Sequence, residues 1–220
     1  MVESTFPLVR VIRNTHNAGF AKANNQGILA SGGRYVLLLN SDTLVPPGSL
    51  SVLMELMERH PEAGACGPRL LRGDGSIQPF SFGGDPTPGY LLRRALTHLW
   101  LRRSIHDWDA DDLLNPDWVA GTCLLARREA IDQAGLMDEA IFLYFEDNEW
   151  CLRMRRCGWK IYYCPQVSIT HLGGQSVSRN PDAQGAYCRS LEYFYSKHYG
   201  PAARLWLKAA LPVYRRLLPH

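Results

Sequence analysis

The sequence predicts an α/β fold with a mostly parallel central sheet flanked by helices. The residues from Tyr35 to Leu39 form an uninterrupted apolar run, typical of a strand buried on both faces in a parallel sheet. After Pro47, apolar residues recur at positions 50, 53, 54 and 57, the spacing of a helix that packs on a sheet. With 220 residues, of which 46% are hydrophobic, the chain is long enough for one domain with a sizeable core.

The first predicted unit is a strand, a helix and a second strand. Phe6 to Ile12 is predicted to be a short strand, and a helix is predicted from about Ala18 to Ala30, with Asn17 as its N-cap. Gly32 and Gly33 follow the end of this helix. The chain would then return to the strand at Tyr35 through a right-handed crossover, which gives a β-α-β unit.

The middle of the chain predicts one more strand and a long irregular region. Ala63 to Leu71 is predicted to be a strand, and Asp74-Gly75 predicts a hairpin turn after it. Tyr90 to Arg103 predicts a helix, and His106 to Asp112 predicts an acidic linker. Long loops often act as lids or binding loops, so we expect variable specificity in the region from Pro79 to Pro116.

The second half predicts further strands and helices. Trp118 to Ala126 predicts a strand, and Arg128 to Ala134 predicts a short helix closed by Gly135. A helix is predicted from Glu146 to Gly158. Two short strands are predicted after it, from Trp159 to Cys164 and from Val167 to His171.

The C-terminal region predicts a long helix and a basic amphipathic segment. The helix would start after Asp182 and be closed by Gly200-Pro201. Pro212 is expected to kink the segment that follows. Such a segment can lie on an anionic membrane or pack on its own domain. We therefore expect one domain over residues 1–200 and a separate basic amphipathic segment over residues 201–220.

The composition argues against several classes of protein. A net charge of +3, spread along most of the chain, does not favour binding to nucleic acid. The six cysteines form no C-x-x-C pair, so they are expected to be buried thiols in a reducing compartment. Residues 1–7 lack the apolar core of a signal peptide, and no apolar run approaches about 18 residues. These features predict a cytoplasmic protein.

Three polar positions follow predicted strands or begin a predicted helix. Asp42 follows the Tyr35 strand beside Asn40, Glu146-Asp147 begins a helix, and His171 ends a strand. Each has a structural alternative, because an Asp often caps a turn, acids favour the first turn of a helix, and a histidine is often buried in a core. Together they match the chemistry of group transfer from a nucleoside diphosphate. That transfer needs a divalent cation, which Asp42 and His171 could hold, and a base, which Asp147 could supply.

Other site chemistries lack their motifs. The chain has no G-x-S-x-G segment, so a Ser-His-Asp hydrolase is less well supported. It also has no G-x-G-x-x-G after a predicted strand, so dinucleotide binding is not indicated.

Several motifs, in their order along the chain, resemble those of family 2 glycosyltransferases of the rhamnosyltransferase-like kind. The matching segments lie between Val11 and Ser176: Asn17-Ala18-Gly19-Phe20, Asn24-Asn25-Gln26-Gly27, Tyr35 to Thr43, Pro47-Gly48, Gly121-Thr122 and Phe145-Glu146-Asp147. The resemblance implies a GT-A fold, a nucleotide-sugar donor, Mg or Mn as cofactor, and inversion at the sugar carbon. It also implies a glycan or lipid-linked acceptor in cell wall or polysaccharide biosynthesis.

The resemblance also implies roles for individual residues. Asp42 matches the acid that binds the metal bridging the diphosphate, and Asn40 stands where the motif often has its first Asp. Asp147 matches the base, with Glu146 orienting it or binding the acceptor. His171 matches a histidine that completes the metal site in some members. The residues implied for the donor pocket are Asn17, Gly19, Asn25, Asn40 and Asp42.

One departure from the family pattern concerns the start of the chain. Family members usually open with two strands that hold the nucleoside, one ending in Thr-Tyr-Asn and one in Asp-Asn-x-Ser, and neither is present here. We therefore expect an N-terminally incomplete GT-A domain that binds donor weakly. The alternative from another class is a non-catalytic glycosyltransferase-like remnant or binding module. A peripheral position at the inner face of the membrane, reached through the C-terminal segment, is a further expectation.

Overall fold

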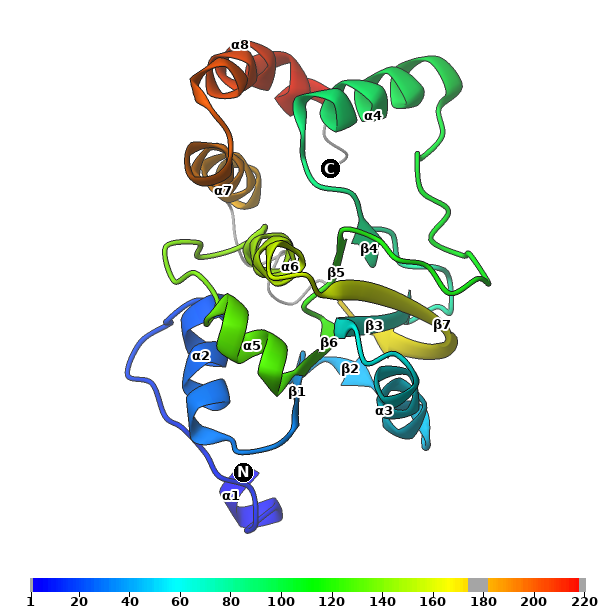
Figure 1. Ribbon diagram of the computed structural model, residues 1–220, viewed down its shortest axis with the longest axis vertical. Coiled ribbons are helices and arrows are strands. Elements are labelled where there is room, and N and C mark those ends of the chain that lie inside the picture. Colours follow the sequence, from blue (N-terminus) through cyan, green and yellow to red (C-terminus); the bar gives the residue numbers. More distant parts are fainter. Residues whose placement is uncertain (1, 174–181, 218–220) are drawn as a thin grey trace.

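The computed structural model describes residues 2–173 and 182–217 and shows a sheet between layers of helices (Figure 1). The main sheet has five strands in the order β1-β6-β3-β7-β2. Its strands are β1 (Tyr35–Leu39), β2 (Thr43–Leu44), β3 (Ala63–Leu71), β6 (Cys123–Arg127) and β7 (Lys160–His171). A separate two-stranded ribbon pairs β4 (Phe82–Gly83) with β5 (Trp118–Val119).

The sheet is mixed, so the prediction of a mostly parallel sheet was wrong. Only β3 and β7 pair in parallel, whereas β1 with β6, β3 with β6 and β2 with β7 pair in antiparallel fashion. The apolar run in β1 has another cause. Val36 and Leu38 pack into a core cluster on one face, and Tyr35 and Leu37 pack against a second cluster on the other. Cover on both faces makes the strand apolar, whatever the direction of its neighbours.

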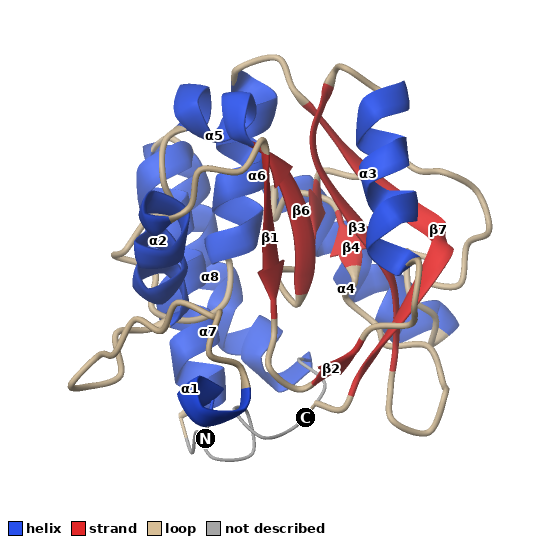
Figure 2. Cartoon of the chain, turned by 90° about the horizontal axis from the view of Figure 1, so that it is seen from below, coloured by secondary structure: helices blue, strands red, loops and turns tan. Residues whose placement is uncertain are grey.

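Helices cover both faces of the sheet (Figure 2). On one face lie α2 (Phe20–Ala30), α5 (Arg128–Ala134) and α6 (Glu146–Arg156), whose buried residues share a core cluster with β1. On the other face lies α3 (Ser49–Arg59), whose Leu53 and Met57 pack into the second cluster. The predicted amphipathic stripe after Pro47 is therefore confirmed as a helix packed on the sheet.

Three helices form a third cluster at one end of the molecule (Figure 1). They are α4 (Pro88–Leu101), α7 (Ala183–His198) and α8 (Pro201–Leu217), which contribute Leu91, Leu191, Leu207 and Leu211 to a shared core. From α7, the Ser190 hydroxyl donates to the Leu143 carbonyl at 2.7 Å, and the Tyr195 hydroxyl donates to the Pro86 carbonyl at 2.6 Å. The amphipathic segment predicted at the C-terminus thus packs its apolar face on the rest of the chain. None of the described helices has the length and hydrophobicity of a transmembrane segment.

The predicted strand from Phe6 to Ile12 is wrong. Residues 6–12 are irregular chain that follows a short helix, α1 (Val2–Thr5), and the predicted β-α-β unit is therefore absent from the described residues. Leu8 is 99% exposed and Phe6 is 59% exposed. The segment has the composition of a strand, but its backbone pairs with no strand in the part that the structure describes. A strand needs a neighbour for its hydrogen bonds, and composition does not supply one.

Other boundaries differ in smaller ways. β1, β3 and α5 begin and end at the predicted residues. The predicted strand from Trp118 to Ala126 is divided by a turn at Gly121-Thr122, whereas the two strands predicted near the chain end are one strand, β7. The helix predicted from Ala18 begins at Phe20, because Gly19 takes a positive φ of 80° and Asn17 Oδ1 accepts from the Gly19 amide at 3.0 Å.

Candidate functional site

Asp42 and His171 come from distant parts of the chain and meet at one edge of the sheet. Asp42 lies in the turn between β1 and β2, and β2 pairs with the end of β7 so that Thr43 is opposite His171. The Leu172 amide also donates to the Asp42 carbonyl at 2.8 Å. This pairing places Asp42 Oδ1 3.2 Å from His171 Nε2, with both side chains mostly covered. The prediction that these two residues share a site is consistent with this geometry.

The partners of His171 define which ring nitrogen carries the proton. Nδ1 lies 2.9 Å from the Gln78 side-chain oxygen, which can only accept, so Nδ1 donates. Nε2 lies 3.2 Å from Asp42 Oδ1 and 3.4 Å from Asn40 Nδ2. When Nε2 carries a proton it donates to Asp42, and when it carries none, it and the carboxylate oxygen could together bind a cation.

The donor set fits part of a divalent metal site. A carboxylate oxygen and a neutral imidazole nitrogen suit Mn²⁺, and a carboxylate also suits Mg²⁺. Within residues 2–173 and 182–217, no group of three or more His, Cys, Asp or Glu residues could hold a metal ion. The described side chains would therefore supply only some of the ligands, and the others would come from a bound substrate or water.

Asp147 sits in the first turn of α6, behind an unusual turn. Tyr144 and Phe145 both have positive φ angles, 64° and 68°, which residues other than glycine seldom adopt. Phe145 is held there by its ring, which packs against Tyr187 and Phe194 with centroids 4.9 and 6.0 Å apart. Strained backbone of this kind clusters at functional sites, where surrounding contacts hold a side chain in a required place.

The Asp147 carboxylate is held by neutral donors. The Gly121 amide donates to Oδ2 at 2.9 Å, and the Asn148 amide donates to Oδ1 at 2.8 Å. In the side-chain orientation that satisfies both its polar atoms, Asn148 Nδ2 also donates to Oδ1 at 2.9 Å. Burial raises the pKa of Asp147, although these backbone donors act in the opposite direction. Among the described residues no basic side chain pairs with it, so the group has the character of a base in a water-poor site.

Glu146 is a buried acid with an unsatisfied oxygen. It is 7% exposed, and its Oε2 has no hydrogen-bond partner in the described part of the chain. Burial, followed by the charge of Asp147, raises the pKa of Glu146 to about 8. The side chain is therefore protonated at neutral pH and able to donate a hydrogen bond.

The turn at Gly121-Thr122 joins the two halves of the site. Gly121 donates to Asp147, and the carbonyl of Thr122 accepts from the Asn40 amide at 2.9 Å. A Cβ on Gly121 would lie 3.0 Å from the Phe20 ring and 3.7 Å from Asp147 Cβ, so a side chain here would crowd the site. This turn therefore connects the base candidate directly to the end of β1 that carries Asp42.

Of the residues predicted to line a donor pocket, Asn17 and Gly19 lie at the start of α2. A Cβ on Gly19 would lie 2.8 Å from the Phe142 ring, so this point packs closely against the segment that leads into α6. Asn25 lies elsewhere and is 2% exposed. Its amide donates to and accepts from the Met137 backbone, both at 2.9 Å. The Asn25 side chain is therefore bonded to the loop that contains Met137, and its role in donor binding stays a prediction.

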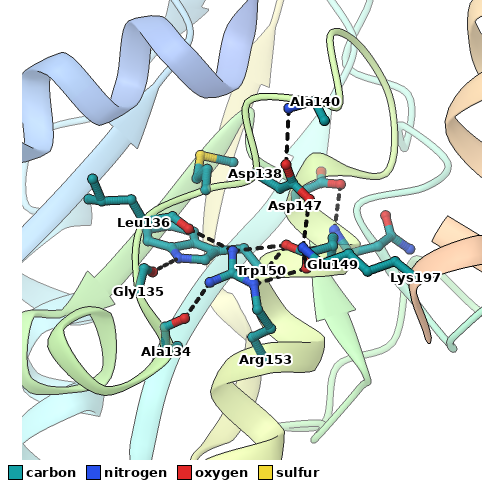
Figure 3. Close-up of polar contacts among 12 residues, drawn as sticks. Ala134, Gly135, Leu136, Asp138, Ala140, Asp147, Glu149, Trp150, Arg153 and Lys197 are labelled. Atoms are coloured by element: carbon teal, nitrogen blue, oxygen red, sulfur yellow. Dashed lines mark hydrogen bonds and ion pairs between the residues drawn. The ribbon is translucent and has the colours of Figure 1, made fainter. Parts of the chain in front are cut away.

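Sequence reasoning missed a third acid on α6, Glu149. Figure 3 shows it with Arg153 and Lys197, and it is fully buried. Arg153 Nε donates to both of its oxygens at 2.9 Å, and Lys197 Nζ lies 2.7 Å from Oε1. Burial raises the pKa of Glu149, but the bonds from Arg153 and Lys197 outweigh that effect and lower it overall. The spacing of Glu149 and Arg153, one helical turn apart, was a readable signal for this pair.

Arg153 and Trp150 also fasten α6 to the loop after α5. Arg153 donates to the carbonyls of Ala134 and Leu136, and Trp150 Nε1 donates to the carbonyl of Gly135 at 2.8 Å (Figure 3). Three consecutive carbonyls at the end of α5 are thereby satisfied by side chains of one helix. Gln78 was also missed, and no local pattern in the sequence marks it as the partner of His171.

Comparison with known proteins reveals relatives of one kind. The family described as "Glycosyl transferase family 2" matches residues 1–95. An N-acetylglucosaminyl-diphospho-decaprenol L-rhamnosyltransferase of Mycobacterium tuberculosis is 29% identical over 227 residues, covering 94% of this chain and 71% of that protein. The dTDP-rhamnosyl transferase RfbF of Shigella flexneri is 25% identical, over 77% of this chain and 54% of that protein. The chain is therefore similar to family 2 glycosyltransferases of the rhamnosyltransferase kind. The predicted resemblance is confirmed, and these matches support an enzyme.

Solved structures confirm the GT-A type of α/β fold. GalNAc-T7 with UDP, GalNAc and Mn²⁺ matches with a TM-score of 0.64 and 17% identity, over 99% of this chain and 41% of that one. A mannosyltransferase of Pyrobaculum calidifontis, in complex with GDP-Man and Mn²⁺, matches with a TM-score of 0.56 and 16% identity, over 97% of this chain and 56% of that one. The chain thus spans about half the length of these two structures.

Proposed function

We propose that this chain is an inverting glycosyltransferase that moves a sugar from a nucleotide-sugar donor to a lipid-linked glycan acceptor. The names of the curated relatives favour rhamnose as the sugar and a polyprenyl diphosphate as the lipid. The observation that carries the proposal is the placement of Asp42 with His171 at the end of β1, joined through Gly121-Thr122 to Asp147.

Asp42 and His171 would hold Mg²⁺ or Mn²⁺ beside the diphosphate of the donor. The Gln78 contact supports this assignment, because it leaves His171 Nε2 free to coordinate. Asn40 lies next to both ligands. When bound, the ion would supply positive charge to the leaving diphosphate. Asn17, Gly19 and Asn25 are proposed to shape the donor pocket, with Asn25 acting through the Met137 loop.

Asp147 would act as the general base. Its carboxylate takes the proton of the attacking acceptor hydroxyl, whose oxygen forms a bond to the anomeric carbon. The bond from that carbon to the diphosphate oxygen breaks on the opposite face, and the nucleoside diphosphate leaves with the electron pair. One displacement inverts the sugar carbon. The hydrogen bonds from Gly121 and Asn148 would keep the carboxylate oriented during this transfer.

Glu146 is proposed to orient the acceptor. Its pKa, raised to about 8, keeps the carboxyl protonated near neutral pH. The unsatisfied Oε2 would then have a sugar hydroxyl as its partner.

A transfer assay tests this function. The chain is incubated with dTDP-rhamnose, Mn²⁺ and an N-acetylglucosaminyl-diphospho-polyprenol, and the release of dTDP and the extended lipid are followed. We expect metal-dependent transfer that Asp42→Ala and Asp147→Asn abolish. Donor binding without transfer in the unmodified chain would instead support a non-catalytic binding module. If both variants transfer sugar as fast as the unmodified chain, the proposed roles of Asp42 and Asp147 are wrong.

A further inference from the structure

The outer face of α4 carries an exposed apolar stripe. Leu92, Leu96, Leu99 and Trp100 follow the i, i+4, i+7, i+8 spacing of one helix face, and they are 52%, 44%, 52% and 82% exposed. Leu91, on the other side of the helix, is buried among α7 and α8. Tryptophan and leucine are costly to leave in water together, so a continuous stripe of this kind indicates a surface that binds something.

Basic residues surround the stripe, and acidic residues are missing from this stretch of sequence. Arg93 lies beside it, and Arg102 and Arg103 follow its end, all three exposed. The sequence contains no Asp or Glu from Pro86 to His106. The Asp and Glu that are absent from this stretch leave only basic charges on α4 and its end, and these complement a negatively charged surface.

The neighbouring helix, α8, also exposes apolar and basic residues. α8 packs beside α4 through Leu207 and Leu211, and both helices lie at one end of the molecule (Figure 1). α8 exposes Leu205, at 71%, and also Arg204 and Lys208, which line a hollow beside Glu192 and Tyr193 of α7. No acidic residue follows Glu192 in the sequence.

We propose that α4 docks this protein on an anionic lipid bilayer. We call the residues Leu92, Leu96, Leu99, Trp100, Arg102 and Arg103 the α4 face. The leucines and Trp100 would enter the boundary between headgroups and acyl chains, while the arginines contact lipid phosphates. Choosing a bilayer over another partner rests partly on the proposed function, because a polyprenyl-linked acceptor is held in a membrane.

Vesicle flotation of the full chain tests the proposal. We expect binding to vesicles of equal phosphatidylglycerol and phosphatidylcholine and little binding to phosphatidylcholine alone. Each basic residue near such a surface contributes about 5-fold in affinity, so Arg102→Gln with Arg103→Gln is expected to weaken binding about 30-fold. Leu99→Ser with Trp100→Ser is expected to weaken it at least as much, because it removes the apolar anchor.

Matched controls lie on other helices. Leu29→Ser on α2 and Arg59→Gln on α3 change an equally exposed leucine and an exposed arginine, and they are expected to leave flotation unchanged. A thermal melt of each variant establishes that it is folded. Full flotation of both α4 variants, or an equal loss in the controls, would overturn the proposal. Equal binding to neutral vesicles would overturn the part played by charge.

Two further measurements separate this surface from its alternatives. If the α4 face pairs with a second copy of the chain, sedimentation would show a dimer that Trp100→Ser dissociates, without vesicle binding, and the proposal would be overturned. Asp147→Asn is expected to lose transfer but to float normally. The α4 variants are expected to keep transfer to a short, water-soluble acceptor analogue. Failure of docking and failure of the proposed catalysis would therefore give different results.

Discussion

Three carboxylates lie in the first turn of α6, and the surroundings of Glu149 differ from those of Glu146 and Asp147. Glu149 is fully buried and receives charged donors from Arg153 and Lys197, and His198 Nε2 lies 3.1 Å from its Oε1. Glu146 and Asp147, at the start of the same helix, have no basic partner among the described residues. Burial raises the pKa of both of these acids, whereas the cations around Glu149 lower its pKa. Glu149 is therefore paired with cations, whereas Glu146 and Asp147 are not, as their proposed roles require.

The comparison separates stability from chemistry within one helix. A buried charge that is fully paired holds elements together, here α6 to α7 and to the loop after α5. A buried acid without a cation costs stability, so its retention points to function. Each of the following substitutions tests one side of this difference.

The largest effect is expected for Asp147→Asn. Gly121 and Asn148 donate to different oxygens of Asp147, so the single amide oxygen of the variant can accept from only one of them, and it cannot take a proton; turnover should fall by about 10²- to 10⁴-fold. The change is measured as the initial rate of dTDP release with saturating acceptor. Donor affinity and the melting temperature serve as controls and should stay near those of the unmodified chain. Near-normal turnover would remove Asp147 from the role of base.

Glu149→Gln should act on stability instead. Removing one member of a buried charge pair typically costs about 3–5 kcal/mol, and we expect about 3 kcal/mol because Arg153 and Lys197 keep some contact with water. Urea unfolding measures the free energy, and turnover per folded molecule should remain. Glu55→Gln is the matched control, because its pair with Arg59 is exposed and should contribute less than about 1 kcal/mol. Equal losses in both variants would contradict a special role for burial.

Glu146→Gln should change how stability depends on pH. The folded chain holds this proton more tightly than the unfolded chain, whose ordinary pKa is 4.5. The contribution of the proton is complete below that value and is lost as pH rises through about 8. From pH 5 to pH 8 the unmodified chain should therefore lose about 1 kcal/mol or more relative to Glu146→Gln. Parallel stability curves for the two proteins would show that Glu146 is charged in the folded state.

The smallest effect is expected for Lys197→Met. Its side chain is about one third exposed and pairs with Asp138 as well as Glu149, so its loss should cost about 1 kcal/mol. The double variant with Glu149→Gln should lose less unfolding free energy than the sum of the two single losses, because both substitutions remove the same contact. Strict additivity in urea unfolding would mean that Lys197 and Glu149 do not interact.

Local patterns were enough to predict two strands of the sheet and one helix that covers it. β1, β3 and α5 follow from short apolar or helical patterns that carry their own boundaries. Phe6 to Ile12 has the composition of a strand, but composition does not reveal whether a neighbouring strand exists. The strand directions were missed for a related reason, because an apolar run reports cover on both faces and not the orientation of the next strand.

The site was predictable as a set of residue types but not as a set of contacts. Asp42 and His171 meet through β2, a strand of only two residues that no periodicity can reveal. Asn25 falls within a predicted helix and is predicted to bind the donor, but its hydrogen-bond partner Met137 lies far along the chain. Glu149 and Arg153 were readable as a helical pair, whereas Lys197 comes from another helix. A contact between a side chain and a residue far along the chain cannot be predicted from local sequence patterns.

Two hydroxyl groups of α7 bond to the segments that lead to α4, the proposed docking helix, and to Asp147, the proposed base. Tyr195 secures Pro86, just ahead of α4, while Ser190 secures Leu143, just ahead of the Tyr144-Phe145 turn that introduces Asp147. Helix α7 thus connects the start of α4 to the turn that precedes Asp147, the proposed base. On a bilayer, this connection would set the distance between the lipid phosphates and the site that receives the acceptor hydroxyl. The length of the acceptor headgroup would then help to select the acceptor.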